Sequence, residues 1–456
     1  MNQLYRPFLL MGLTVAILLA MHVLPTLGWG DITMRRVNVL SDVLPEVYRQ
    51  RDAIDVIPPP PPPKKVADDS KDKATTAETS EKVKVKPVPK GMVGIDDYSG
   101  GAPGGMDHFR SVLRKINQMD RPVRIAYFGD SFIEGDVLTC DLREQLQCRY
   151  GGQGVGWVDC VDKLAGFRRT AKVTSSGLAD FEVVTKPFDH RFEGISQRYY
   201  RPSEGGRFSV QATGYKKHAA QCERVCLFLR TEGGTVVEKD DGSEVRIEGR
   251  KAVQCVELAR GKDIRTASCR LKSVGRSTYL YSMTMESDHG VVLDNFSMRG
   301  SSGATLAQIP AATLSDFARL RPYDLIILHF GLNVLNEKAH AANYKAYAKK
   351  METVVNHLRQ AYPEASVLIV SVPDRDQRTA AGIRTMNGVE SLVGYQQILA
   401  SDTGVAFFNL FQAMGGRESM SKLVARKMAN KDYAHLSFGG GAHVSQFIYK
   451  AITWGN

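Results

Sequence analysis

The stretch Gly129-Asp130-Ser131-Phe132-Ile133-Glu134-Gly135-Asp136 decides how this sequence is interpreted. It follows an apolar, β-prone run at residues 123–128 and leads into a helical pattern at residues 136–150. A strand that ends in Gly-Asp-Ser and continues as a helix predicts a sharp strand-to-helix turn. Such a turn raises a serine hydroxyl out of the backbone at the C-terminal edge of a parallel sheet, where open α/β folds bind their ligands. We therefore predict that Ser131 is a nucleophile.

The partners that a nucleophilic serine needs lie near the C-terminus, in Asp432-Tyr433-Ala434-His435. A base must remove the hydroxyl proton, and a third group must hold that base in position. Asp432 and His435 are about one turn apart, so both side chains can face one point. We interpret His435 as the base and Asp432 as the group that orients it. This chemistry needs no metal and no cofactor.

Further segments occur in the same chain order. Together they resemble the SGNH, or GDSL-type, hydrolase superfamily, whose blocks are matched in turn by Gly129-Asp130-Ser131, Gly300, Gly331-Leu332-Asn333, and Asp432 with His435. Gly303 is close to Gly300 and is the alternative for the second block. Val334 stands where the family often has an aspartate, so any role of that aspartate is lost. The resemblance extends over residues 92–155 and 290–456.

The resemblance implies a catalytic triad of Ser131, Asp432 and His435. It also implies an oxyanion hole made of the backbone amides of Ser131 and Gly300 and the side chain of Asn333. Such donors stabilise the negative charge that develops on the carbonyl oxygen, and losing one typically lowers the rate by roughly 10²–10³-fold.

The bulk composition is that of an ordinary globular protein. The chain has 456 residues, of which 43% are hydrophobic and 24% are charged, and it is long enough for two domains. Its formal net charge is +11, but the basic residues are scattered and no nucleic-acid-binding motif occurs. A basic protein beside anionic lipid or wall polymer explains this charge. Nucleic acid is therefore not an expected partner.

The N-terminal part predicts an anchor and a tether. Residues 7–24 form an almost continuous apolar run without a following Ala-x-Ala site, so an uncleaved transmembrane signal anchor in residues 1–30 is favoured over a cleaved signal peptide. Six prolines at residues 58–63 and a charged stretch at residues 64–90 predict a stiff rod and a disordered spacer, within a linker at residues 31–90. We expect the remaining chain to be exported and to lie in the cell envelope, on the periplasmic side.

Residues 158–289 interrupt the α/β pattern. Short β-prone runs recur there, separated by turn signals such as Asp240-Asp241-Gly242, which is typical of an antiparallel β-sandwich. Helix–strand alternation then returns, so residues 91–157 and 290–456 are predicted to form one α/β domain, a parallel sheet flanked by helices. An insertion at this place resembles that of bacterial peptidoglycan O-acetylesterases and O-acetyltransferases, whose inserted β-domain is similar to a carbohydrate-binding module.

The predicted insertion leaves two alternatives open. Tyr199, Tyr200 and Tyr215 either stack on sugar rings or have ordinary core and surface roles. The seven cysteines of the chain are either mostly free, buried thiols or partly paired, and one option is a bridge between Cys255 and Cys269.

The resemblance implies a serine esterase that removes O-acyl groups, O-acetyl first of all, from a cell-envelope carbohydrate such as peptidoglycan. The first alternative is an O-acetyltransferase with the same triad, supplied with acyl groups by a membrane partner. The second is a non-catalytic, tethered carbohydrate-binding protein, against which the intact Ser131, Asp432 and His435 argue.

Overall fold

The computed structural model describes residues 11–14, 28–29, 32–33, 87–164 and 166–455, which belong to two compact units, Met1–Asp55 and Val56–Asn456. In the first unit, β1 (Gly28–Trp29) pairs with β2 (Ile32–Thr33). The predicted anchor at residues 1–30 and linker at residues 31–90 lie almost entirely outside the described residues. Within the part of the chain that the structure describes, no helix is both long and apolar enough to cross a membrane.

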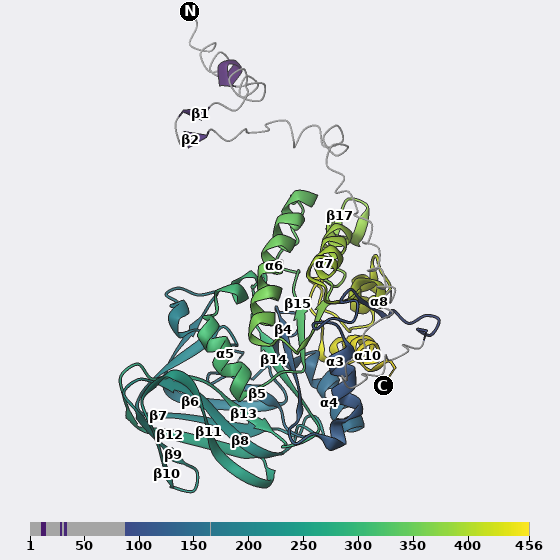
Figure 1. The fold of residues 1–456 in the computed structure, drawn as a ribbon. Coiled ribbons are helices and arrows are strands. Elements are labelled where there is room, and N and C mark those ends of the chain that lie inside the picture. Colours follow the sequence, from purple (N-terminus) through teal and green to yellow (C-terminus); the bar gives the residue numbers. More distant parts are fainter. Residues whose placement is uncertain (1–10, 15–27, 30–31, 34–86, 165, 456) are drawn as a thin grey trace, which may run out of the picture. The chain divides into compact units, whose positions relative to one another are not determined.

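The second unit contains a six-stranded sheet in the order β14-β4-β15-β16-β19-β3 (Figure 1). Its strands are β3 (Ile95–Asp97), β4 (Val123–Gly129), β14 (Val291–Ser297), β15 (Leu325–His329), β16 (Ser366–Val370) and β19 (Ala406–Phe408). All are parallel except β3, which adds an antiparallel edge. β4 and β15 are buried along their whole length, which agrees with their mostly apolar sequences.

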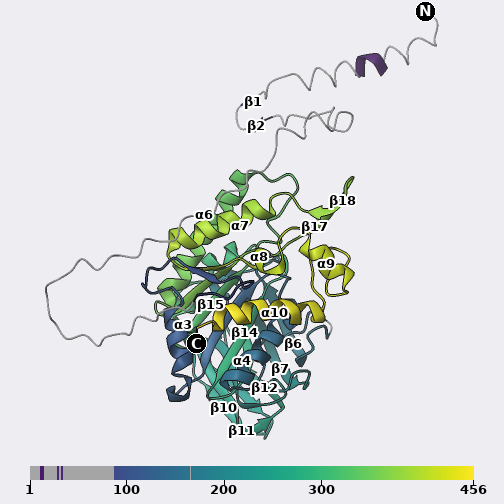
Figure 2. The same ribbon diagram turned by 90° about the vertical axis from the view of Figure 1, so that its right-hand side faces the viewer.

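Helices cover both faces of this sheet (Figures 1 and 2). They are α3 (Asp107–Arg114), α4 (Thr139–Tyr150), α5 (Ala311–Leu320), α6 (Ala341–Ala361), α7 (Val389–Thr403), α8 (Leu410–Met414), α9 (Ser419–Ala425) and α10 (Phe438–Thr453). α6 packs against α5 and α7, whereas α4 packs against α10. The chain moves from β4 to β14 in one direction and from β14 to β15 in the other, so right-handed crossovers place α4 and α5 on opposite faces. This reversal makes the C-terminal end of β4 the switch point at which open α/β sheets bind ligands.

A separate antiparallel sheet of nine strands is inserted into this fold, with the order β10-β9-β12-β7-β13-β8-β11 and with β5 and β6 pairing to β13 and β7 (Figure 1). Its strands are β5 (Gly156–Val158), β6 (Ala171–Glu182), β7 (Arg198–Ala212), β8 (Cys222–Thr231), β9 (Thr235–Lys239), β10 (Glu244–Ile247), β11 (Arg250–Ile264), β12 (Thr266–Val274) and β13 (Tyr279–Glu286). All nine lie between β4 and β14 in the sequence, although β4 and β14 are neighbours in the central sheet. The antiparallel part thus interrupts the α/β part.

A buried ion-pair network joins the two sheets. Glu286 of β13 lies 2.9 Å from Arg124 of β4 and 2.6 Å from Arg321, and Arg321 lies 2.6 Å from Asp294 of β14. Burial alone would raise the pKa of Glu286, but Arg124 and Arg321 lower it to about 2. Because removing one partner would leave a buried charge uncompensated, the network fixes how the inserted sheet meets the central one.

The structure differs from the sequence-based prediction in a few elements. The sequence pattern of residues 106–119 predicts one helix, whereas the structure has α3 followed by the short 3₁₀-helix η1 (Ile116–Gln118). The pattern also predicts a closing helix that starts at Gly441. In the structure this helix, α10, begins at Phe438, because the Ser437 side chain accepts a hydrogen bond from the Gly440 amide and caps it. The edge strand β3 and the hairpin of β17 (Asp376–Thr379) and β18 (Gly382–Thr385) have no counterpart in the prediction.

All seven cysteines are free thiols. The optional bridge between Cys255 and Cys269 is wrong, because the two residues lie on strands that are not neighbours. Cys255 is on β11, which pairs with β8, whereas Cys269 is on β12, which pairs with β7 and β9.

Candidate active site

Three side chains from distant segments meet at the C-terminal end of β4. Ser131 Oγ lies 2.8 Å from His435 Nε2, and His435 Nδ1 lies 2.8 Å from Asp432 Oδ2. The loop that carries Asp432 and His435 precedes α10 and is held by an antiparallel bridge between Ala429 and Leu436. The structure therefore brings together all three residues that the sequence singles out as a triad.

Asp432 is held as a hydrogen-bond acceptor. Its Oδ1 accepts the backbone amides of Ala434 at 3.0 Å and His435 at 3.1 Å. Burial would raise the pKa of Asp432, but the hydrogen bonds from the His435 side chain and the two amides outweigh it and lower that pKa. An ionised Asp432 holds the proton of His435 on Nδ1, which leaves Nε2 free to accept the proton of Ser131.

Asp130, the residue before the serine, has a role that sequence reasoning missed. It is buried, and its Oδ1 accepts the amide of Phe132 at 2.9 Å. Burial raises the pKa of Asp130 to about 6, against hydrogen bonds from the amides of Phe132, Leu332 and Gly331 that lower it. Asp130 thereby ties the turn after β4 to the loop that carries Asn333. Its place in the Gly-Asp-Ser motif is the only sequence signal of this contact.

Asn333 is the predicted side-chain donor of the oxyanion hole. Asn333 is exposed, and its side-chain Nδ2 donates to the carbonyl oxygen of Ser301 at 3.0 Å. A carboxamide nitrogen carries two hydrogens. The bond to Ser301 fixes the plane of the carboxamide and leaves the second hydrogen for a ligand.

The two glycines that could supply a backbone amide differ in their surroundings. Gly300 is exposed, and a Cβ placed there would meet nothing within 4 Å. Gly303 is buried, has a φ of +85°, and would place a Cβ 2.7 Å from the ring of Phe330. The Gly303 amide already donates to the Ser301 hydroxyl at 3.0 Å, so its hydrogen is not left for an oxyanion. The predicted role of Gly300 stays a prediction.

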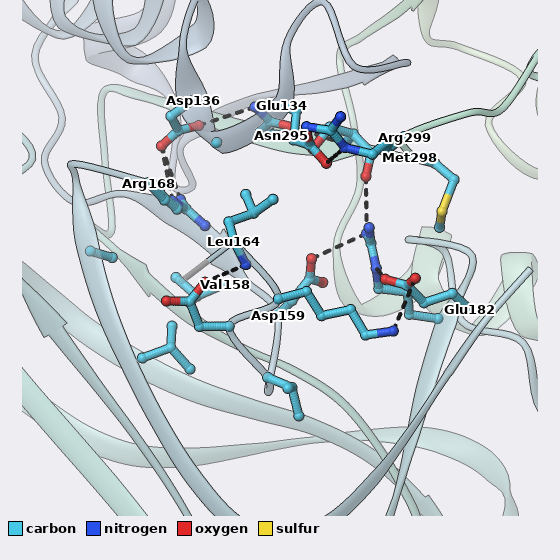
Figure 3. A pocket seen from close by; sticks show the side chains of 18 of the residues that line it. Glu134, Asp136, Val158, Asp159, Leu164, Arg168, Glu182, Asn295, Met298 and Arg299 are labelled. Carbon is cyan, nitrogen blue, oxygen red and sulfur yellow. Dashed lines mark hydrogen bonds and ion pairs between the residues drawn. The ribbon is translucent and has the colours of Figure 1, made fainter. Parts of the chain in front are cut away.

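A cavity of about 230 Å³ with both apolar and charged lining residues lies beside the serine turn (Figure 3). It is lined by the 3₁₀-helix η2 (Glu134–Asp136), the segment after β5, parts of β6 and β7, and the end of β14. Each basic side chain of the lining is paired with a carboxylate: Arg299 with Glu134, Arg168 with Asp136, Arg198 with Asp159, and Lys163 with Glu182. The cavity therefore offers many hydrogen-bonding groups without an unpaired cation.

The tyrosines of the inserted sheet separate into two groups. Tyr199 and Tyr200 are 4% and 1% exposed, so both have core roles. Tyr215 is 38% exposed and lies 5.7 Å, between ring centroids, from Phe438. Phe167, which sequence reasoning missed, is 46% exposed and lies 5.5 Å from the same ring.

Two histidines lie near the motifs but outside the triad. His329 is buried, its Nδ1 lies 3.0 Å from the Tyr127 hydroxyl, and burial lowers its pKa to about 3. The pKa of His443 on α10 is lowered by burial and by Arg426. His329 is therefore a neutral, structural residue of β15.

Comparisons with known proteins agree with this fold. Residues 273–440 match the model of the GDSL-like Lipase/Acylhydrolase family. No curated protein matches the chain. A solved structure described as a peptidoglycan O-acetylesterase in action is similar over 78% of this chain and 97% of that chain, with 20% identity and a TM-score of 0.64.

Two carbohydrate esterase structures are also similar, at lower scores. A family two carbohydrate esterase from Cellvibrio japonicus covers 51% of this chain and 86% of its own, with 10% identity and a TM-score of 0.19. A family 2 enzyme with a carbohydrate binding domain from Corynascus thermopiles (Myceliophthora fergusii) covers 55% and 94%, with 13% identity and a TM-score of 0.28. At these TM-scores, the two structures do not bear on the fold of this chain.

The family match gives the class of this protein. Residues 273–440 carry a GDSL-like acylhydrolase domain, so the protein is a hydrolase that acts on acyl groups. The 20% identical structure agrees with this in fold. The matched residues include Asn333, Asp432 and His435, and the fold adds Ser131 from the preceding segment.

Proposed function

We propose that the protein removes O-acetyl groups from a cell-envelope carbohydrate, with peptidoglycan as the first candidate, through an acyl-enzyme on Ser131. The observation that carries this proposal is the unbroken hydrogen-bond chain from Ser131 through His435 to Asp432. In an acylhydrolase domain this is the arrangement that activates a serine.

In the first half-reaction, Ser131 Oγ attacks the carbonyl carbon of the ester while His435 Nε2 takes the hydroxyl proton. The carbonyl oxygen becomes an oxyanion, which the Ser131 amide, the second N–H of Asn333 and a glycine amide of residues 300–303 stabilise. The bond to the sugar oxygen then breaks, and the protonated His435 returns its proton to that oxygen. The acetyl group remains on Ser131, and ionised Asp432 stabilises the imidazolium that forms in between.

In the second half-reaction, a water molecule attacks the acetyl carbonyl as His435 takes one of its protons. The intermediate collapses, acetate leaves, and the proton returns to Ser131 Oγ. The His435 and Asp432 side chains are 35% and 48% exposed. This openness gives water access to the acyl-enzyme, which hydrolysis requires.

The substrate class is supported by two independent features. The similarity in fold to a structure described as a peptidoglycan O-acetylesterase supports an acetylated glycan. The apolar run at residues 7–24 supports export to the envelope, where such a polymer lies. The inserted sheet borders the cavity beside Ser131 and gives a polymer a surface to lie against.

The test is acetate release from purified O-acetylated peptidoglycan, compared with the Ser131→Ala protein. Wild-type protein should release acetate, and the variant should not. Mass spectrometry of the glycan fragments distinguishes hydrolysis from transfer: a gain of 42 Da on an added acceptor glycan would indicate a transferase, as expected from the mass of an acetyl group replacing a hydrogen (about 42 Da). Wild-type protein that leaves the glycan acetylated while hydrolysing small esters would contradict the proposed substrate.

A further inference from the structure

Two exposed aromatic rings pack against the start of the helix that follows the loop of His435. Among the large hydrophobic side chains exposed in the described part of the chain, the aromatic ones are Phe167 and Tyr215. Both pack against Phe438, the first residue of α10 and the third after His435. Exposed aromatic rings that share one neighbour form a surface, whereas scattered ones do not.

Cations complete this aromatic surface. The Arg169 guanidinium lies 4.2 Å from the ring centroid of Phe438 and 5.5 Å from that of Tyr215, and Lys216 Nζ lies 5.0 Å from the Tyr215 ring. Cation–π contacts of this kind hold rings in a defined orientation. The surface thus combines aromatic rings with hydrogen-bond donors that lie over the Tyr215 and Phe438 rings.

The loop that carries Phe167 is fixed onto the serine turn. The Phe167 ring covers Gly135, where an added Cβ would lie 2.4 Å from Cδ1, so only glycine leaves room for the ring. The neighbouring Arg168 donates from Nε to Asp136 Oδ2 at 3.1 Å, and Asp136 is buried. The aromatic surface is therefore positioned before a ligand arrives, which lowers the entropic cost of binding.

The adjoining cavity indicates the charge of the ligand. Gly135 and Leu164 line that cavity, and the Phe167 amide donates to the Leu164 carbonyl at 3.0 Å. Because the basic groups of the lining are paired with carboxylates, a phosphate or carboxylate would find no unpaired cation there. A neutral polyol matches the alternating donors and acceptors (Figure 3).

We propose that Phe167 and Tyr215, which pack against the buried Phe438, form a stacking site for a pyranose ring of the glycan, adjacent to the sugar that carries the scissile ester. One face of a pyranose consists of C–H groups and packs on aromatic rings, and its hydroxyls reach Arg169 and the cavity. This inference rests on the proposed function and deepens it, because it makes the glycan chain, rather than the acetyl group alone, the ligand. Nothing in this role requires the rings to contact the reacting atoms.

The test compares two substrates in the full-length protein. For Phe167→Ala and Tyr215→Ala, the ratio of kcat/KM on O-acetylated peptidoglycan to kcat/KM on p-nitrophenyl acetate should fall about tenfold each, as expected for one lost aromatic contact. Phe167→Tyr and Tyr215→Phe keep the rings and should restore the ratio. Phe167→Leu keeps apolar volume over Gly135 without a ring, so it should behave like Phe167→Ala.

Lys217→Ala is the matched control, because Lys217 is exposed on the same loop as Tyr215. It should leave the ratio unchanged. An unchanged ratio in both alanine variants, or an equal fall for Lys217→Ala, would overturn the stacking site. The p-nitrophenyl acetate activity of each variant also reports whether it is folded.

A binding experiment separates this inference from the proposed function. Calorimetry on the Ser131→Ala protein should show binding of chitohexaose, a neutral pyranose oligomer, and Phe167→Ala in that background should weaken it about tenfold. If wild-type protein releases no acetate from peptidoglycan but chitohexaose binds in this way, the proposed function fails and the stacking site stands. If chitohexaose binds equally well without the Phe167 ring, or does not bind at all, the stacking site is wrong.

Discussion

The hydroxyl of Ser131 lies 2.8 Å from Nε2 of His435, within hydrogen-bond distance and along the path that a proton must take. Because the same imidazole is held by Asp432 through Nδ1, the serine and the histidine act as one unit. Removing either leaves the other without a partner for proton transfer.

We therefore expect Ser131→Ala and His435→Ala each to remove nearly all esterase activity on p-nitrophenyl acetate. The double variant should lose little more than either single one, since residues that act as a unit have non-additive effects. Initial rates of all three variants check this. Wild-type turnover by Ser131→Ala would show that another residue is the nucleophile.

Asp432→Asn should retain more activity than either of those variants, by roughly one to two orders of magnitude. The substitution removes the charge that stabilises the imidazolium but leaves the base itself in place. Asp432 is 48% exposed, so water can partly replace its contact with His435. A residual rate as low as that of His435→Ala would mean that orientation by Asp432 is as important as the base.

The parts of this site that sequence predicts are those with a local signature. A buried parallel strand is a mostly apolar run, as β4 and β15 are, and a Gly-Asp-Ser turn directly after such a run fixes where the serine lies. Asp432 and His435 are close in sequence, so their spacing alone brings them to one point. These features need no knowledge of the tertiary structure.

The remaining parts arise from contacts between distant segments, which a single sequence does not encode locally. The bonds of Asp130 to the Gly331 and Leu332 amides depend on β4 and β15 being neighbours. Phe167 and Tyr215 meet only because their loops both reach Phe438. The strand β3 was beyond prediction because it is three residues long and contains two aspartates.

Asn333→Ala should lower kcat by roughly two to three orders of magnitude with little change in KM, as expected for a donor used mainly in the transition state. The carboxamide is already oriented by its bond to Ser301, so the enzyme loses a fixed donor rather than a mobile one. Steady-state kinetics on a small ester measure both constants. A rise in KM at constant kcat would instead assign Asn333 to substrate binding.

Gly300→Ala tests the predicted glycine of the oxyanion hole. Gly300 has a positive φ, so the substitution carries a backbone strain of about 1–2 kcal/mol, but the added methyl group meets nothing within 4 Å. Because this strain displaces the Gly300 amide, we expect Gly300→Ala to lower kcat on a small ester at least about tenfold, with little change in KM. An unchanged kcat would exclude Gly300 as the donor.

Asp324 provides a test of stability that is independent of catalysis. Its side chain is fully buried and accepts Arg121 Nη1 and Nη2, both at 2.8 Å, and the Arg124 amide at 2.9 Å. Burial would raise the pKa of Asp324, but the hydrogen bonds from Arg121 and His108 lower it to about 2.

A carboxyl whose pKa is lower in the folded than in the unfolded state stabilises the fold above the unfolded pKa, and this contribution is lost as the pH falls through the folded value. For Asp324 the window runs from about pH 4 down to about pH 2, and the shift corresponds to about 2 kcal/mol at neutral pH. Asp324→Asn should therefore lower the free energy of unfolding by at least that amount at pH 7. The difference from wild type should shrink between pH 4 and pH 2, as guanidinium chloride titrations at several pH values would measure.

Glu244→Gln, which removes an exposed carboxylate of β10 paired with Lys272, is the control and should change the free energy of unfolding by less than about 0.5 kcal/mol. A difference between Asp324→Asn and wild type that stays constant from pH 7 to pH 2 would mean that the ionisation of Asp324 does not contribute to stability.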